Sequence, residues 1–234
     1  MPQGNLPPAA GPETSSATVV HVGRLIVIEG LDGAGKRTLT GGLTSELTAR
    51  GATVTTAAFP RYTDDVHAEL VAEALNGSHG DLGSSVHGMA ILYALDRRGA
   101  AERLRADIAA HDVVLLDRYV ASNAAYGAAR LREHSDGEFV SWVRELEIDR
   151  FGLPRPDLQL LLRVSTELAA GRAQHRERTE SDRKRDRFES DESLQQRCAE
   201  VYVELAAAGW WSPWLVVDGA AEADFGALAD RILN

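Results

Sequence analysis

The stretch GLDGAGKRT, from Gly30 to Thr38, sets the class of fold that the sequence predicts. It follows the pattern Gly-x4-Gly-Lys, in which backbone N–H groups surround phosphate oxygens. The pattern alone occurs by chance in roughly one chain in fifteen of this length. Here it lies between an apolar run, LIVIE (25–29), and a helical pattern that begins at Lys36. This order of strand, loop and helix is typical of a phosphate-binding loop.

The loop departs from the usual pattern at two positions. Asp32 places a carboxylate among the N–H groups, and Arg37 stands where a serine or threonine usually offers a hydroxyl to Mg²⁺. We therefore expect Mg²⁺ to be held through water by Asp32 or by Asp117, which ends the apolar run 112–117. Two alternatives stay open: Asp32 could cap the following helix, and Asp117 could simply end a strand.

Lysine is almost absent from the sequence, which adds weight to Lys36. Of the 25 basic residues, only Lys36 and Lys184 are lysines. A compact ammonium fits inside a tight loop and reaches the β- and γ-phosphates of a nucleotide, whereas a planar guanidinium would not. We therefore interpret Lys36 as a phosphate ligand and not as an incidental charge.

From Arg24 onward, short apolar runs alternate with longer helical patterns, which is typical of βαβ units and a parallel sheet. The continuous Val, Leu and Ile runs suit strands covered by helices on both faces. We predict a three-layer α/β domain of the P-loop NTPase fold with a five-stranded parallel sheet. Strands are expected at 25–29, 53–59, 112–117, 157–164 and 214–218, and helices at 36–50, 64–76, 85–110, 122–132, 137–151 and 194–205.

Composition limits what the protein can do. The 234 residues are 44% hydrophobic, enough for one domain with a sizeable core, and the net charge of -10 gives no general attraction to a nucleic-acid polymer. No apolar run approaches the roughly 20 residues that span a bilayer. The single cysteine, Cys198, is expected to be buried and inert. Residues 1–22 predict a flexible extension and no secretory signal, so the domain should occupy 23–234.

Three further clusters could build a second pocket. FPRY (59–62) and DRYVASNAAY (117–126) follow the second and third expected strands, at the edge of the sheet where ligands collect. LYALDRR (92–98) places Tyr93 and Arg97 four residues apart, on one helical face. Each cluster alone is better explained by core packing or solvated charge. Together they supply groups that suit a phosphate, a base edge and a base face.

These motifs resemble the thymidylate kinase family, particularly its mycobacterial-type members. The resemblance is carried by EGLDGAGKRT, FPRY, LYALDR and LDRYVASNAAY, in this order, and extends over nearly the whole chain from about Leu25. It implies a nucleoside monophosphate kinase with a lid, which transfers the γ-phosphoryl group of ATP, with Mg²⁺, to dTMP and yields dTDP and ADP for dTTP biosynthesis. It further implies a homodimer in the cytoplasm.

The resemblance assigns the loop to the donor nucleotide and implies a catalytic role for Asp32, Lys36 and Arg118. Asp32 would touch the acceptor sugar and the surroundings of the metal, while Lys36 and Arg37 would hold donor phosphates. The loop residues expected to bind ATP are Gly30, Leu31, Asp32, Gly33, Ala34, Gly35, Lys36, Arg37 and Thr38.

The other motifs resemble the acceptor site of the family. Phe59, Tyr62 and Arg118 are similar to residues that place the acceptor phosphate. The full set implied for the acceptor is Asp32, Phe59, Tyr62, Tyr93, Arg97, Arg118, Ser122, Asn123, Tyr126 and Glu189.

Recognition of the base and sugar is implied at four of these positions. Arg97 and Asn123 resemble residues that bond the thymine edge. Tyr126 matches a tyrosine that lies under the sugar and disfavours a ribose 2′-hydroxyl. Tyr93 stands where the mycobacterial pattern usually has a phenylalanine for stacking on the base, and a phenol ring keeps that π face.

The run GRAQHRERTESDRKRDRF (171–188) has seven Lys/Arg against four Asp/Glu between Arg172 and Arg187. Such a run is usually a solvated helix or a mobile loop. After the fourth strand of a P-loop kinase it resembles the lid, which closes over ATP and brings arginines to the phosphates. Because Asp32 is followed by Gly33, and not by an arginine as in some family members, the lid should supply the catalytic cation. The candidates are Arg172, Arg176, Arg183 and Arg187, with Glu189 implied near the metal and sugar.

Two rival functions stay open. A deoxynucleoside kinase would share loop and lid but would want a carboxylate base after the second strand, where FPRY offers cationic and aromatic groups. A non-catalytic nucleotide-binding relative is harder to distinguish, although intact Asp32, Lys36, Arg97 and Arg118 argue against it. A GTPase switch is excluded, because neither lysine lies in an Asn-Lys-x-Asp motif.

Overall fold

The computed structural model describes residues 22–179 and 191–234, with side chains as far as His175 in the first range. Residues 1–21 of the expected N-terminal extension (1–22) and the lid residues Arg183, Arg187 and Glu189 lie outside the described residues, as does the side chain of Arg176. In the part that is described, no helix is both long and apolar enough to cross a membrane.

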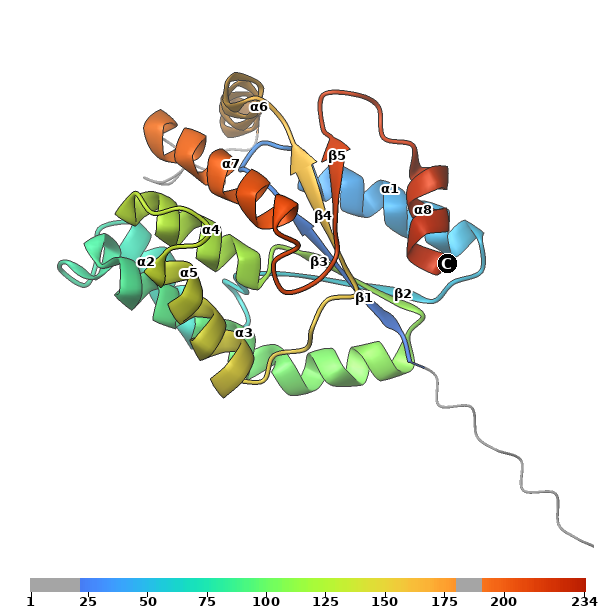
Figure 1. The fold of residues 1–234 in the computed structure, drawn as a ribbon, viewed down its shortest axis with the longest axis horizontal. Helices are drawn as coiled ribbons and strands as arrows, with labels where there is room; N and C mark the ends of the chain where they lie inside the picture. Colours follow the sequence, from blue (N-terminus) through green and yellow to red (C-terminus); the bar gives the residue numbers. More distant parts are fainter. Residues whose placement is uncertain (1–21, 180–190) are drawn as a thin grey trace, which may run out of the picture.

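A parallel sheet forms the centre of the described domain (Figure 1). Its five strands lie in the order β2-β3-β1-β4-β5, so that β1 is central and lies between β3 and β4. The register pairs Ile28 of β1 with Asp117 of β3 and with Leu160 of β4. The strands are β1 (Arg24–Glu29), β2 (Val54–Ala58), β3 (Val113–Asp117), β4 (Leu158–Arg163) and β5 (Trp214–Asp218).

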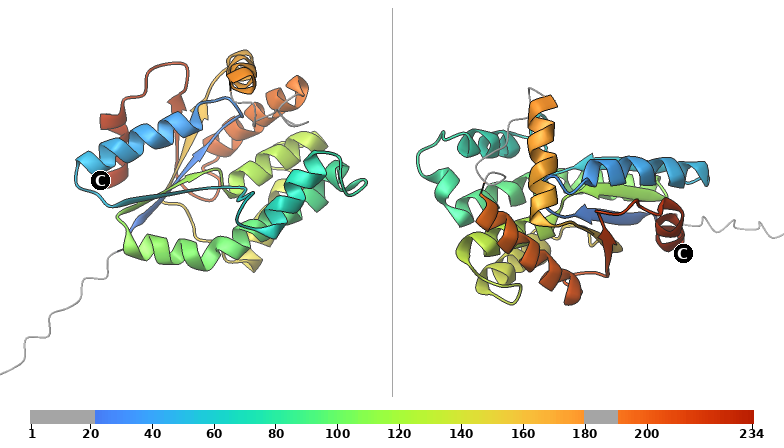
Figure 2. Two further views of the ribbon diagram at one scale, coloured as in Figure 1. Left: turned by 180° about the vertical axis from the view of Figure 1, so that it is seen from behind. Right: turned by 90° about the horizontal axis from the view of Figure 1, so that it is seen from above.

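Helices cover both faces of this sheet, as Figures 1 and 2 show. On one face, α1 (Lys36–Ala49) and α8 (Phe225–Leu233) pack on alternate strand residues such as Ile26, Leu115 and Leu160. On the other face, Val27, Leu116 and their neighbours meet the larger layer of helices. That layer consists of α2 (Val66–Leu75), α3 (Val86–Ala110), α4 (Val120–Leu131), α5 (Glu138–Val143) and α7 (Glu192–Ala207). Both faces of the three central strands, β1, β3 and β4, are therefore buried, which is why their sequences are largely apolar without alternation.

The structure confirms the predicted three-layer α/β architecture and all five strands. The Ser85 side chain accepts a hydrogen bond from the N–H of Gly88 and thereby caps the N-terminus of α3. Cys198 is fully buried in the core, as expected.

Four elements differ from the prediction. The expected helix 137–151 is α5 followed by a π-helix, η2 (Arg144–Arg150). The sequence did not predict this change, because so short a stretch carries no period that separates the two helix types. The first part of the charged run 171–188 belongs to a helix, α6 (Thr166–Thr179), which starts beyond the tip of β4 (Figure 1). Helix α8 was not predicted, and a short 3₁₀ turn, η1 (Leu82–Ser84), precedes α3.

Two adjacent glycines of α1 offer a test of the packing between α1 and α8. A Cβ at Gly42 would lie 2.2 Å from ring atoms of Phe225, whereas a Cβ at Gly41 would meet nothing within 4 Å. Alanine at Gly41 should therefore raise the free energy of unfolding by about 0.5–1 kcal/mol, because alanine favours a helix. Alanine at Gly42 should lower it by about 1–3 kcal/mol, because the α8 contact becomes overpacked.

The two variants control for each other, since both make the same substitution in the same helix. Urea unfolding at equilibrium measures both changes. Equal effects of Gly41→Ala and Gly42→Ala would show that α8 does not pack on α1 in this way.

Candidate active site

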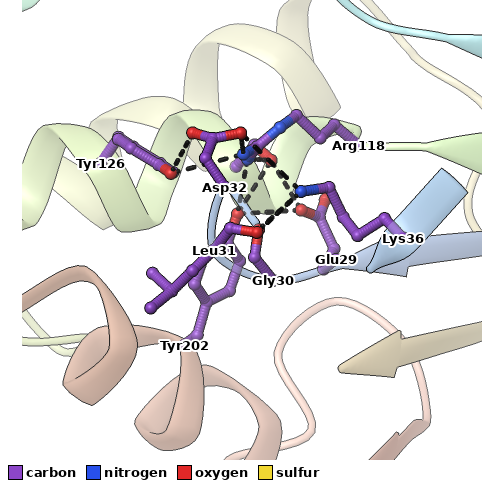
Figure 3. A network of polar contacts seen from close by, with 9 residues as sticks. Glu29, Gly30, Leu31, Asp32, Lys36, Arg118, Tyr126 and Tyr202 are labelled. Carbon is purple, nitrogen blue, oxygen red and sulfur yellow. Dashed lines mark hydrogen bonds and ion pairs between the residues drawn. The ribbon is translucent and has the colours of Figure 1, made fainter. Parts of the chain in front are cut away.

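Asp32 lies at the centre of a polar network at the carboxyl end of the sheet (Figure 3). Its Oδ1 accepts a hydrogen bond from Nη2 of Arg118 at 2.6 Å, and its Oδ2 accepts one from the Tyr126 hydroxyl at 2.8 Å. The ammonium of Lys36 is 3.9 Å from Oδ1. Residues from the loop, from the end of β3 and from α4 thus converge on one carboxylate. The sequence prediction placed these residues in one site, and the structure brings them together.

Lys36 is held inside the loop. Its Nζ donates to the carbonyl oxygens of Gly30 at 3.2 Å and Leu31 at 2.9 Å, and the side chain is only 7% exposed. Helix α1 begins after Gly35, at φ 103°, with no side-chain cap. The alternative in which Asp32 caps α1 is therefore wrong, since the carboxylate turns to Arg118 and Tyr126 instead.

Gly33 explains why the loop carries no arginine at this position. The residue has φ 80°, and a Cβ there would lie 2.1 Å from the carbonyl oxygen of Ala169 in α6. Only glycine adopts this conformation freely and leaves room for the α6 backbone. Position 33 therefore cannot supply a cation to the loop without a shift of the backbone.

Glu29, the last residue of β1, is a site residue that the sequence reading missed. Its side chain is fully buried, and Oε1 accepts from the N–H of Tyr119 at 2.9 Å. Oε2 accepts from the hydroxyls of Ser122 at 2.6 Å and Tyr202 at 3.0 Å. The available signal was a carboxylate at the end of an otherwise apolar strand, directly before the loop.

Arg118 connects the two acids. Its Nη1 donates to Ser122 at 3.0 Å and to Tyr202 at 3.4 Å, both of which bond to Glu29, while its Nη2 bonds to Asp32. The guanidinium also lies 5.2 Å from the ring centre of Tyr126. Arg118 has φ 67°, a left-handed conformation that costs a non-glycine residue roughly 1–3 kcal/mol and that its contacts must offset.

Burial and charge act against each other on the three central groups. Burial alone would raise the pKa of the Asp32 carboxyl, but Arg118 and Lys36 outweigh it and hold that pKa below its ordinary value. Burial, aided by the positive charge of Arg118, lowers the pKa of Lys36. Burial would also lower the pKa of Arg118, yet Asp32, Tyr126, Tyr202 and Asp117 together more than compensate, and this pKa lies well above its ordinary value.

Asp117 carries the observation that bears on a metal ion. Its Oδ1 is buried, and in the described part of the chain it has no hydrogen-bond partner. A buried carboxylate oxygen without a donor is costly, so a water or a hydrated cation at this position fits the site. Within residues 22–179 and 191–234, no group of three His, Cys, Asp or Glu side chains could hold a metal directly. A mainly water-coordinated Mg²⁺ matches this donor set.

The expected base-reading residues lie on α3 and α4. Arg97 is buried and donates from Nε and Nη2 to the two carboxylate oxygens of Glu147, at 2.5 and 2.8 Å. The Nδ2 of Asn123 also donates to Glu147, at 2.7 Å. Glu147, which is fully buried, was missed by the sequence reading because it lies in the π-helix, 24 residues after Asn123. Tyr93 is half-buried against the same core.

The FPRY segment is fixed to α3 by its arginine. The backbone N–H and Nε of Arg61 donate to the buried carboxylate of Asp96, at 2.9 and 2.7 Å. Phe59 is buried, with its ring 5.9 Å from that of Tyr119, and Tyr62 is 42% exposed. Arg61 and Asp96 were not among the predicted site residues, although both lie in motifs that the sequence reading singled out.

On the donor side, Arg172 of α6 reaches the loop. Its Nη1 donates to the carbonyl oxygens of Ala34 at 3.1 Å and Gly219 at 3.0 Å. Arg37 and Thr38 lie exposed in the first turn of α1. Arg172 therefore lies between the phosphate loop and the turn after β5.

The fold and the site define a P-loop nucleotide-binding protein in which a second cluster of polar groups faces the loop. The family model described as thymidylate kinase matches residues 28–221. A thymidylate kinase of Mycobacterium tuberculosis (strain H37Rv) is 54% identical over 205 residues, which cover 88% of this chain and 95% of that protein. The chain therefore belongs to the thymidylate kinase family, which confirms the resemblance seen in its motifs.

More distant relatives agree. A thymidylate kinase of Xanthomonas oryzae pv. oryzae (strain PXO99A) is 35% identical over 90% of this chain and 86% of its own length. A thymidylate kinase of Caenorhabditis elegans is 29% identical over 83% of this chain and 84% of its own length. The matches span bacteria and an animal and cover most of each chain.

The ion pair of Asp32 predicts a pH dependence of stability. Because the folded pKa lies below the ordinary value of 3.8, the carboxylate stabilises the fold fully above that value. This contribution is lost as the pH falls through the folded pKa. Asp32→Asn should therefore lower the free energy of unfolding by about 1–3 kcal/mol near neutral pH. The difference from the wild type should shrink in acid, below the ordinary value.

Urea unfolding over a pH series measures this difference. Asp149→Asn, which changes an exposed aspartate of η2 in the same way, controls for the loss of one charge. A difference between wild type and Asp32→Asn that stays constant into acid would contradict the ion pair.

Proposed function

We propose that the protein transfers the γ-phosphoryl group of ATP to the 5′-phosphate of dTMP, giving dTDP and ADP. The observation that carries the proposal is the contact of Arg118 with Asp32, because it joins the phosphate loop to the polar groups that follow β3. Membership of the thymidylate kinase family supports the choice of substrates. On the same basis we propose a role in dTTP biosynthesis, a homodimer and a cytoplasmic location.

In the reaction, an oxygen of the dTMP phosphate forms a bond to the γ-phosphorus, while the bond from that phosphorus to the β,γ-bridging oxygen breaks. ADP leaves with the bonding electrons. The acceptor phosphate is already anionic near neutral pH, so the site needs no strong base. Its task is to align the two phosphates and to stabilise the spreading charge.

Lys36, which is buried, and Arg118, which is partly buried, are the cations for this task in the described site. Lys36 lies in the loop, where its ammonium can reach donor phosphates. Arg118 faces Asp32 and α4, and it would place the acceptor phosphate. Bound phosphates would raise the lowered pKa of Lys36 again, so the ligand itself would secure the charged form of the lysine.

Mg²⁺ would be held through water by Asp32 and by the unpaired Oδ1 of Asp117, with Glu189 outside the described residues as a third candidate. When bound, it would neutralise charge on the β- and γ-phosphates. Arg172, together with Arg176, Arg183 and Arg187, remains our candidate source of lid cations, and Arg172 already contacts the loop.

The remaining assignments follow the resemblance. Tyr126, bonded to Asp32, would lie under the sugar, and Tyr93 would stack on the base. Phe59 and Tyr62 would flank the acceptor phosphate, on a segment that Arg61 ties to α3. A deoxynucleoside kinase is disfavoured, because Arg61 and not a carboxylate follows Pro60 after β2.

The proposal is tested with purified protein, ATP and Mg²⁺, by following ADP formation with dTMP, dUMP, dCMP, UMP and thymidine offered separately. We expect fast turnover with dTMP and slower turnover with dUMP, since one methyl group is worth about 1–3 kcal/mol. Turnover with dCMP should be at least about 100-fold slower, because mispaired buried polar groups discriminate more strongly than a methyl group.

Incubation without acceptor measures background ATP hydrolysis. Turnover of thymidine but not of dTMP would make the protein a nucleoside kinase. No turnover with any acceptor would favour the non-catalytic alternative.

A further inference from the structure

We propose that Glu147 sets the preference for thymine over cytosine by fixing the orientation of Asn123 and Arg97. It acts as a positioning residue, since it reaches the base only through these two side chains. The inference rests on the proposed function, because it concerns the same acceptor base. It adds a residue that neither the motifs nor the family membership assigns.

The contacts of Glu147 are unusual in their number and burial. Oε1 accepts from Nη2 of Arg97 at 2.8 Å and from Nδ2 of Asn123 at 2.7 Å, while Oε2 accepts from Nε of Arg97 at 2.5 Å. All three side chains are buried, with 0% exposure for Glu147, 3% for Arg97 and 6% for Asn123. The carboxylate thus joins η2 to α3 and α4 at one point.

These contacts fix which atoms remain for a ligand. Nδ2 of Asn123 carries two hydrogens, and it donates to both Glu147 and the carbonyl oxygen of Ala90 at 3.0 Å. These two contacts use both amide hydrogens of Asn123, so that its amide oxygen, an acceptor, remains for a ligand. Arg97 uses Nε and one hydrogen of Nη2, which leaves Nη1 as a donor group.

One acceptor and one donor match the pairing edge of thymine. Thymine presents N3–H, a donor, beside O4, an acceptor. Cytosine presents the opposite pattern, with an acceptor at N3 and an amino group at C4. Asn123 and Arg97 in this orientation therefore complement thymine at two atoms and oppose cytosine at both.

Glu147 holds this orientation because a carboxylate only accepts hydrogen bonds. If the Asn123 amide turned over, its oxygen would face Oε1 of Glu147 and the carbonyl oxygen of Ala90, and acceptor would meet acceptor. A π-helix at this position is consistent with such a role, since π-helical segments frequently lie at functional sites.

Replacement by glutamine makes the prediction specific. In Glu147→Gln, the side-chain oxygen can still accept from Arg97, and the new amide group then faces Asn123 as a donor. A turned Asn123 amide can offer its oxygen to that donor and its own N–H to N3 of cytosine. Only the carbonyl oxygen of Ala90 still opposes this orientation, so a larger fraction of the variant adopts it. We expect the ratio of kcat/KM for dTMP to that for dCMP to fall by about tenfold or more, mainly through a gain with dCMP.

A purely structural role predicts a different result. Loss of a buried partner would then lower kcat/KM for both nucleotides by the same factor and leave the ratio unchanged. Glu145→Gln is the matched control, because it makes the same change two residues away in η2, at an exposed side chain. This control should leave both the ratio and the turnover as in the wild type.

Stability is measured alongside, because removing one charge from the buried pair could unfold the protein. If Glu147→Gln does not fold, Glu147→Asp keeps the charge opposite Arg97 but shortens the reach by one methylene. The ratio should then fall as well, by a smaller factor. If Glu147→Gln folds and keeps the wild-type ratio of kcat/KM for dTMP to that for dCMP, the proposal is overturned. If Glu147→Gln does not fold, a folded Glu147→Asp with the wild-type ratio overturns it.

Calorimetric binding of dTMP and dCMP in the absence of ATP separates this inference from the proposed function. If the wild type binds dTMP in preference to dCMP but does not phosphorylate it, the proposed function fails while the effect of Glu147→Gln on the affinity ratio remains measurable. If the wild type shows no preference between the two nucleotides, the inference itself is wrong.

Discussion

The ion pair of Arg118 and Asp32 is the contact on which the rest of the site depends. It ties the phosphate loop to the end of β3 and the start of α4, across the point where β1 and β3 lie side by side. Neither charge suits its partly buried surroundings alone, since removal of one partner leaves the other with a desolvation cost that nothing offsets. The left-handed backbone of Arg118 shows the same dependence, because only its contacts hold it in that conformation.

Two buried glutamates organise α4 from opposite sides. Glu29 accepts from Ser122, and Glu147 accepts from the next residue, Asn123. Consecutive residues in the first turns of one helix are thereby fixed to β1 on one side and to η2 on the other. Tyr202 of α7 extends the first group, since its hydroxyl bonds to Glu29 and Ser122 (Figure 3). The residues proposed to place the acceptor phosphate and those proposed to read the base therefore share one helix, which suits the proposed reaction because it depends on alignment.

Local sequence was sufficient for the sheet, the phosphate loop and the convergence of Asp32, Lys36 and Arg118. Strand positions follow from apolar runs, and parallel strands bring their carboxyl ends to one edge. Glu29, Glu147 and the Arg61–Asp96 pair could not be predicted in the same way, because each depends on which side chains meet across elements far apart in the chain. The π-helix was missed for a related reason, since its hydrogen-bond pattern leaves no distinct period over seven residues.

The presence of Asp32 in the phosphate loop has a physical explanation in the balance of charge. Without ligands, Lys36 and Arg118 face the carboxylates of Asp32 and Glu29, and Asp117 also acts on both cations. Burial and then the charge of Arg118 lower the pKa of Lys36, and the three acids act against this shift. In the proposed reaction, the arriving phosphates would bring several negative charges that the two cations do not neutralise in full. Asp117, with its unpaired oxygen, and Arg172, which already reaches the loop, lie where a hydrated cation and a guanidinium would supply the difference. Asp32 thus stabilises Lys36 and Arg118 in the unliganded site, and the further positive charge would be brought to the phosphates when the substrates bind.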